Sequence, residues 1–282
     1  MHRILRRQQL SENVFRFEIE APRIARKRQG GQFVILRLHE RGERFPLTIA
    51  DADPDQGSIT LIVQAVGKST TQMGRMQEGE AILDVVGPLG KPTPIAKVGT
   101  VVTVGGGIGV AEVYPITQAF KAAGNTVIGI IGARSRDLLI LEAEMRAACD
   151  ELLISTDDGS YGHHGFVSDV LQQLLDRGQQ IGEVVAVGPV PMMRAVCKVT
   201  QPHAIRTMVS LNPIMVDGTG MCGGCRVVVG GETKFACVDG PEFDGHRVDF
   251  DELVKRQRMY LPLEQDVHQC YLDELAARAA AS

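Results

Sequence analysis

Residues 100–112 read Thr-Val-Val-Thr-Val-Gly-Gly-Gly-Ile-Gly-Val-Ala-Glu. The first five residues form a continuous β-branched run, which is typical of a parallel strand that is buried on both faces. The glycines that follow permit a tight turn, and a helical pattern continues from about Val110 to Ala123. A strand, a glycine-rich turn and a helix in this order predict the first unit of a parallel-sheet nucleotide-binding domain.

Strand and helix patterns alternate along the chain after this unit. Gly124 and Asn125 end the first helix, and the next apolar strand begins at Thr126. Further strands are expected over 151–156 and 184–187, and further helices over 137–149, 167–177 and 192–199. Such alternation predicts a parallel sheet that helices cover on both faces.

The N-terminal region has a different pattern, with short alternating stretches at 14–20, 32–38 and 57–64. Gly, Pro, Asp or charged turns bound each stretch, and short strands at this spacing predict an antiparallel barrel. From about Ser210 the helical pattern lapses into a glycine-rich loop region, and a charged helix follows from Asp251.

These patterns predict a β-barrel plus α/β fold with a small C-terminal segment. The expected divisions are a barrel over 1–97, a nucleotide-binding α/β domain over 98–209 and a C-terminal segment over 210–282. A chain of 282 residues is long enough for two domains and an appendage.

Composition excludes several classes of function. The formal net charge of −4 provides no broad basic field for nucleic acid. No stretch reaches the roughly 18 apolar residues that a membrane helix needs, and the N-terminus lacks a secretory signal pattern. We therefore expect a cytoplasmic protein that binds neither nucleic acid nor membrane.

Three of the six cysteines crowd into one glycine-rich segment, in which Cys222 and Cys225 are followed by Cys237. In a reducing compartment such crowding favours a metal site over a disulfide. Plant-type iron–sulfur sites use Cys-x4-Cys-x2-Cys with a distant fourth cysteine. Asp217 stands where the first thiolate would be, so we predict a [2Fe–2S] cluster on Asp217, Cys222, Cys225 and Cys237.

Other interpretations of this segment remain open. A structural zinc site uses the same Cys-x2-Cys spacing but prefers four sulfur or nitrogen ligands. Three thiols without any metal are a further alternative. Asp217 is also a residue type that commonly forms turns next to glycine.

The glycines at Gly105, Gly107 and Gly109 predict a nucleotide site, because backbone amides at a helix N-terminus can approach a pyrophosphate closely. No acidic residue ends the following strand, where NAD sites usually have a ribose-binding carboxylate. Arg134 and Arg136 stand there instead. These residues do not decide between NADH and NADPH.

Two barrel segments suit a flavin. The first holds Arg44, Pro46, Leu47 and Thr48, and the second holds Gly67, Ser69 and Thr70. An arginine and hydroxyl groups beside a glycine turn are suited to phosphates and to a ring edge. Ordinary edge-strand and turn chemistry is the alternative.

Taken in order, these motifs resemble a family of small subunits in the ferredoxin–NADP reductase superfamily, which includes the electron-transfer subunit of dihydroorotate dehydrogenase B. The similar branch is that of NADH-dependent reduced ferredoxin:NADP⁺ oxidoreductase, also called sulfide dehydrogenase. The distinctive stretches are 105–111, 156–165, 187–193 and 210–225. Asp217 in place of a cysteine favours this branch, and Val187 replaces a cysteine that related reductases often have.

The resemblance implies roles for individual residues. Thr48 is implied to lie near the flavin ring, with Ser69 and Thr70 near the flavin pyrophosphate. The nicotinamide nucleotide is implied to contact four residues, Gly105, Gly107, Asp158 and Gly188. Arg44 stands one residue further from Thr48 than in the superfamily pattern, which places it on the other face of a strand.

The resemblance also implies a function. A nicotinamide passes a hydride to FAD, and the electrons then pass singly through the cluster to a larger subunit. That subunit is implied to be a flavin and iron–sulfur protein similar to the small subunit of glutamate synthase, with ferredoxin reached through it. The cofactors carry the chemistry, so we predict no catalytic side chains. A dihydroorotate dehydrogenase-type subunit, a stand-alone NAD(P)H:acceptor reductase and a non-catalytic binding module are the alternatives.

Overall fold

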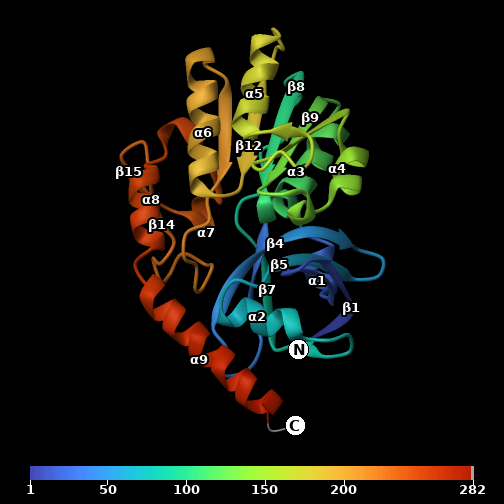
Figure 1. Ribbon diagram of the computed structural model, residues 1–282, viewed down its shortest axis with the longest axis vertical. Coiled ribbons are helices and arrows are strands. Elements are labelled where there is room, and N and C mark those ends of the chain that lie inside the picture. Colours follow the sequence, from blue (N-terminus) through green and yellow to red (C-terminus); the bar gives the residue numbers. More distant parts are fainter. Residues whose placement is uncertain (281–282) are drawn as a thin grey trace.

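The computed structural model describes residues 1–280 and contains two seven-stranded sheets and one short hairpin (Figure 1). The barrel sheet has the order β6-β1-β2-β5-β4-β3-β7, and all its pairs are antiparallel. Its strands are β1 (His2–Ser11), β2 (Val14–Glu20), β3 (Phe33–Arg37), β4 (Arg44–Asp53), β5 (Ser58–Gln64), β6 (Ala81–Ile82) and β7 (Asp84–Leu89).

This sheet is a nearly closed barrel. The strands at its two ends, β6 and β7, are separated in the chain only by Leu83, whose backbone amide donates to the carbonyl of Leu38 (3.2 Å). Helices α1 (Pro22–Ala25) and α2 (Lys68–Arg75) belong to the same part of the chain. Alternate residues such as Ile59, Leu61 and Val63 point into a buried core.

The second sheet has the order β11-β10-β9-β8-β12-β13-β16, and only its last pair is antiparallel. The parallel strands are β8 (Thr100–Gly106), β9 (Thr126–Ala133), β10 (Glu151–Thr156), β11 (His163–His164), β12 (Glu183–Val187) and β13 (Arg206–Ser210). Strand β16 (Glu242–Asp244) comes from the C-terminal segment and pairs with β13.

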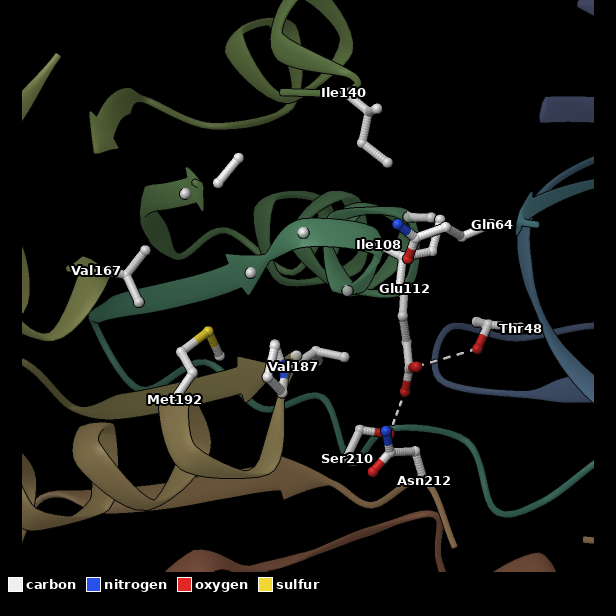
Figure 2. A pocket seen from close by; sticks show the side chains of 18 of the residues that line it. Thr48, Gln64, Ile108, Glu112, Ile140, Val167, Val187, Met192, Ser210 and Asn212 are labelled. Carbon is white, nitrogen blue, oxygen red and sulfur yellow. Dashed lines mark hydrogen bonds between the residues drawn. The ribbon is translucent and has the colours of Figure 1, made fainter. Parts of the chain in front are cut away.

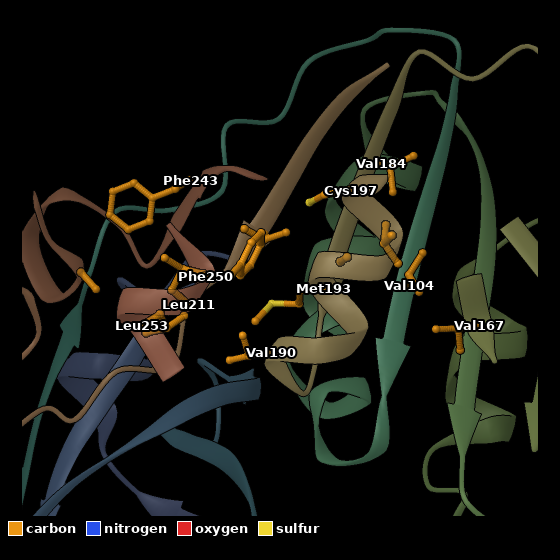
Figure 3. Packing of buried hydrophobic residues seen from close by; sticks show 14 of the residues in the cluster. Val104, Val167, Val184, Val190, Met193, Cys197, Leu211, Phe243, Phe250 and Leu253 are labelled. Carbon is orange, nitrogen blue, oxygen red and sulfur yellow. The ribbon is translucent and has the colours of Figure 1, made fainter. Parts of the chain in front are cut away.

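Helices cover both faces of this sheet, which explains the unbroken β-branched run of β8. Val101 faces α3 (Val110–Ala122) and α4 (Glu142–Ala148), and belongs to the buried cluster that those helices form. Val102 faces the other way, toward α5 (Val167–Asp176) and α6 (Val190–Thr200). Figure 3 shows α6 residues such as Met193 and Cys197 packing on the strands beside Phe250 and Leu253.

The C-terminal segment contains a hairpin of β14 (Arg226–Val229) and β15 (Glu232–Phe235), followed by α7 (Ala236–Asp239), α8 (Phe250–Gln257) and α9 (Leu261–Ala280). Helix α9 buries none of its side chains and runs past the barrel toward the C-terminus (Figure 1). Among residues 1–280, no helix is both long enough and apolar enough to cross a membrane.

The predicted barrel and parallel sheet are confirmed, but two local predictions are wrong. The helix expected over 137–149 is a 3-10 turn at Arg136–Leu138 and a shorter α4, because Ile140 and Leu141 turn into the core and Leu141 takes a left-handed φ of 56°. The expected loop region 210–245 contains three strands, each of only three or four residues.

Candidate functional site

The main pocket has a volume of about 840 Å³ and lies between the barrel and the carboxyl edge of the parallel sheet (Figure 2). Its floor and walls include the ends of β8, β9, β10 and β12 and the loop after β13. Ligands of open α/β sheets bind at this edge. The barrel contributes Pro46, Leu47 and Thr48.

The glycine turn after β8 lets the backbone form one wall of this pocket. Gly107 and Gly109 line it, and Gly107 has a φ of 55°. A Cβ on Gly109 would stand 2.3 Å from the carbonyl oxygen of Val187, which no side chain tolerates. Gly105 lies just outside the pocket lining, where it pairs with Val187 and packs against Val113. The turn therefore requires glycine for close packing and for access to the start of α3.

The other residues predicted to contact the nicotinamide nucleotide lie on two neighbouring loops. Gly188 lines the pocket where β12 ends. Asp158 is exposed in the loop after β10, and its neighbour Asp157 lines the pocket instead. Asp158 accepts hydrogen bonds from the hydroxyl (2.6 Å) and amide (2.9 Å) of Ser160, which lower the pKa of its carboxyl.

The residues predicted for the flavin phosphates lie outside the pocket lining. Gly67 precedes α2, whose Thr70 side chain accepts from the amide of Gly67 (3.0 Å). Ser69 donates to Glu43 (2.5 Å). Arg44 is exposed at the start of β4, and the pairing of β3 with β4 is regular from Arg44 to Thr48, so no bulge alters the side on which Arg44 lies.

Glu112 is a pocket residue that the sequence analysis did not single out. It belongs to the first turn of α3, and its carboxylate accepts from the hydroxyl of Thr48 (3.1 Å) and from that of Ser210. Figure 2 shows its side chain pointing between these two hydroxyls. Burial raises the pKa of Glu112, and the two hydrogen bonds oppose that shift without cancelling it. The sequence feature that could have identified Glu112 is an acidic residue three positions after the last glycine of the turn.

A second buried carboxyl, that of Glu242, lies on the strand next to Ser210. Glu242 of β16 is opposite Ser210 in the β13–β16 pairing and is 9% exposed. One of its oxygens accepts from the hydroxyl of Thr93 (2.6 Å) and the other has no hydrogen-bond partner. Burial raises the pKa of Glu242 to about 8, and the charges of Glu112 and Glu183 add to that shift.

The four predicted metal ligands lie in one segment but form two pairs. The sulfurs of Cys225 and Cys237 are 3.2 Å apart, and both side chains are 1% exposed. Cys222 is exposed, and its sulfur lies 3.3 Å from a carboxylate oxygen of Asp217. Within residues 1–280, no three His, Cys, Asp or Glu side chains are arranged closely enough to hold a metal ion.

Asp217 holds the loop that carries Cys222. Its carboxylate accepts from the amides of Thr219 (3.2 Å), Met221 (3.0 Å) and Cys222 (3.2 Å). Burial acts to raise the pKa of Asp217, yet these bonds lower it to about 2. The residue therefore has the turn-forming geometry that the sequence left open, and its carboxylate is ionised and adjacent to a thiol.

The chemistry of the cysteine loop fits a metal cluster. Two sulfurs 3.2 Å apart can bind one metal together, although without a metal, burial and the contact with Cys225 raise the pKa of Cys237 to about 12 and keep its thiol neutral. A soft metal would hold both as thiolates. Glycines with positive φ at Gly218, Gly220 and Gly223 let the backbone wrap closely.

The pocket and the cysteine loop share one apolar cluster. Phe33, Leu211 and Met215 line the pocket, and they belong to the same group of buried side chains as Cys225 and Cys237. Side chains of one apolar cluster therefore reach both the pocket and the two buried cysteines.

The chain is similar to known proteins both in one segment and over most of its length. Residues 212–249 match the model of the iron–sulfur cluster binding domain of dihydroorotate dehydrogenase B. A Thermotoga maritima protein, a homologue of the electron-transfer subunit of dihydroorotate dehydrogenase B (NAD(+)), is 47% identical over 272 residues, which is 96% of each chain. The corresponding Geobacillus thermodenitrificans subunit is 32% identical over 249 residues, 85% of this chain and 94% of its own.

A solved structure is similar over nearly the whole chain. It comes from work on flavin-based electron bifurcation by the NADH-dependent reduced ferredoxin-NADP oxidoreductase. It has a TM-score of 0.92 and 46% sequence identity, and it covers 96% of this chain and 98% of its own.

Proposed function

Because this chain belongs to the family of dihydroorotate dehydrogenase B electron-transfer subunits and their homologues, we propose that it is the electron-transfer subunit of a flavin-dependent oxidoreductase. It carries electrons between NAD(H), FAD and an iron–sulfur cluster, and exchanges them with a larger partner subunit. The observation that carries this proposal is the apolar cluster shared by the pocket and the cysteines.

The pocket suits a flavin ring facing a nicotinamide. We assign the ring to the barrel wall of Pro46, Leu47 and Thr48, which offers apolar surface and one hydroxyl. The nicotinamide nucleotide is assigned to the opposite wall, which Gly107, Gly109 and Gly188 line. Gly105 and Asp158, which lie next to this wall but outside the lining, are assigned to the same nucleotide. Volumes of about 300–1,000 Å³ are typical of ligand sites.

The phosphates of FAD are assigned to the start of α2. Gly67, Ser69 and Thr70 lie there, outside the pocket, so they suit the part of an extended dinucleotide that continues beyond it. Nothing lies within 4 Å of a Cβ built on Gly67, which leaves its backbone open to a ligand. Arg44 is exposed on the neighbouring strand and is assigned to the same phosphates as a mobile cation.

The cysteine loop is assigned to a [2Fe–2S] cluster with Cys222, Cys225, Cys237 and Asp217 as ligands. When bound, FAD and the cluster together supply the conversion between two-electron and one-electron chemistry. The chain contributes three apolar side chains of the pocket lining, Phe33, Leu211 and Met215, from the same buried cluster that contains Cys225 and Cys237.

We further propose that the larger partner resembles the small subunit of glutamate synthase and that ferredoxin is reached through it. The 46% identity to the solved oxidoreductase over nearly the whole chain supports a bifurcating ferredoxin:NADP⁺ oxidoreductase. The 32% identity to dihydroorotate dehydrogenase subunits makes that enzyme the second candidate. The three divisions 1–97, 98–209 and 210–282 are proposed to correspond to FAD, nucleotide and cluster binding.

Anaerobic purification with and without the neighbouring subunit tests the proposal. We expect bound flavin, iron and acid-labile sulfide in the chain alone, and reduction of NADP⁺ by the complex that requires NADH and reduced ferredoxin together. Dihydroorotate-dependent NAD⁺ reduction would favour the second candidate. A chain without flavin or iron, or full turnover without a partner, would contradict the proposal.

A further inference from the structure

The carboxyl of Glu112 joins the three parts of the molecule at one point in the pocket. Glu112 comes from α3, Thr48 from barrel strand β4, and Ser210 from the end of β13 where the cysteine segment begins. Figure 2 shows the carboxyl between the two hydroxyls. By our assignment the same Thr48 faces the flavin ring.

Both hydroxyls can serve either protonation state of this carboxyl. A Ser or Thr hydroxyl rotates and can donate to a carboxylate or accept from a carboxylic acid. Thr48 and Ser210 therefore satisfy Glu112 before and after it gains a proton. Backbone amides such as those of Met221 and Cys222, which donate to Asp217, lack this property because an amide N–H only donates.

No cation fixes the charge of Glu112. Among residues 1–280 it forms no ion pair, and the other charged residues that line the pocket are Arg134 and Asp157, at the ends of β9 and β10. Glu242 lies behind Ser210 on β16 and has the same sign of charge. Burial raises the pKa of Glu112, and the hydrogen bonds from Ser210 and Thr48 act against that shift.

We propose, on the basis of the proposed function, that Glu112 is the proton-exchange group of this pocket. A hydride brings two electrons and one proton, whereas an iron–sulfur cluster accepts only single electrons. For each hydride, the C–H bond of reduced nicotinamide breaks and two electrons leave through the cluster to the partner. The remaining proton forms an O–H bond on the Glu112 carboxylate, and the reverse direction uses the same proton.

The structure also provides a route to solvent. Ser210 is buried, whereas Asn212 is exposed and lines the same pocket two residues further along. Figure 2 shows Asn212 beside Ser210. The side-chain carbonyl of Asn212 accepts from Gln257 (2.9 Å) at the surface. The exposed residue Asn212 therefore lies two positions along the chain from the hydroxyl that donates to Glu112.

The test uses Glu112→Gln in the full chain, reconstituted anaerobically with flavin and cluster. Infrared difference spectra across pH, taken on the flavin-free protein, report the carboxyl directly. We expect a titrating carboxylic-acid band in the original protein that is absent from E112Q. Proton release after mixing NADH-reduced protein with a one-electron oxidant, followed with an indicator dye, should slow by about 100-fold.

Two comparisons make the result specific. Glu242→Gln changes a buried carboxyl on the strand next to Ser210 and should leave proton release within twofold. Acetate added to Glu112→Ala should restore release, which a merely structural tie between the domains would not allow. Glu112→Asp is the second variant should E112Q fail to fold, and it should retain slower, pH-dependent release.

Unchanged release in E112Q, or an unchanged infrared titration, would overturn the inference while leaving the proposed function intact. If the original protein and every variant lacked flavin or iron, that result would instead contradict the proposed function. If E112Q does not fold, release in E112D at the original rate, with an unchanged infrared band, would overturn the inference.

Discussion

The pocket and the cysteine loop differ in how much of each site the protein builds from regular structure. The pocket is framed by the ends of four parallel strands and by the first turns of α3 and α6. Residues 211–225, which carry three of the four proposed cluster ligands, contain no helix or strand. The parallel sheet therefore positions the pocket, whereas turns and the hydrogen bonds of Asp217 position the ligands in the loop.

The largest expected difference between the two sites follows from Cys225→Ser. Removing one of the two contacting buried thiols should eliminate bound iron and the brown absorbance, while bound flavin stays at its original ratio to protein. Iron, sulfide and flavin analysis of the anaerobic protein measures both. Cys149→Ser is the matched control. Cys149 is a free cysteine outside the segment of the proposed cluster ligands, so this variant should retain iron. Loss of flavin together with iron would contradict separate construction of the sites.

Glu242 connects the two regions, since its strand belongs to the cysteine segment but pairs with the sheet that forms the pocket. The pKa of its carboxyl is about 8 in the fold against an ordinary 4.5, so the folded state binds the extra proton between these values. The contribution of the Glu242 carboxyl to the free energy of unfolding is fully present below pH about 4.5. It is lost as the pH rises through about 8.

Glu242→Gln should therefore flatten the pH dependence of unfolding. We expect a gain of about 2–4 kcal/mol at pH 9 relative to the original protein, from the size of the pKa shift, and little change at acidic pH. Urea unfolding at several pH values measures this. An equal pH dependence in both proteins would show that Glu242 is not buried as a neutral acid.

Gly109→Ala should disturb the pocket and leave the cysteine loop intact, which is the opposite outcome to that of Cys225→Ser. The new methyl group would stand 2.3 Å from the Val187 carbonyl oxygen, so the glycine turn must shift. Overpacking of this kind costs about 1–3 kcal/mol, and NADH affinity should fall more than tenfold while iron content is unchanged. Gly67→Ala, with open space around the new methyl, controls the stability measurement. Normal NADH binding would show that the turn does not shape the nucleotide site.

The smallest effect is expected from Asp217→Asn, which separates the two roles left open for that residue. Asparagine retains an acceptor oxygen for the loop amides but removes the negative charge. If the carboxylate ligates iron, the cluster should still assemble, with a more positive potential and an altered spectrum. Asp244→Asn, at a residue that caps its own turn through the amide of His246 (3.1 Å), is the control. An unchanged potential and spectrum would leave Asp217 with the turn role alone.

The sequence predicted the elements whose signals are local. The β-branched run at 100–104 and the glycines after it predict β8 and the turn, because both depend on a few adjacent residues. The spacing of the cysteines likewise predicts a metal site. Strand β16 has only three residues, which is too short for an alternating pattern to be recognised.

Glu112 could not be predicted as part of the site for a different reason. Its partners Thr48 and Ser210 are 64 and 98 residues away in the chain, and their contact depends on how the barrel packs against the sheet. Arg44 illustrates the same limit. Its distance from Thr48 along the strand was readable, but the absence of a bulge between them is a property of the β3–β4 pairing.

Strand β16 also matters during synthesis of the chain. One edge of β13 pairs with β12, and the other edge pairs with β16, which follows more than thirty residues later in sequence. Until residues 242–244 leave the ribosome, that edge presents unpaired backbone groups, the kind of surface through which nascent chains aggregate. The segment that holds the cysteines therefore also shields the sheet from other chains, and truncation before Glu242 would leave this edge permanently open to them.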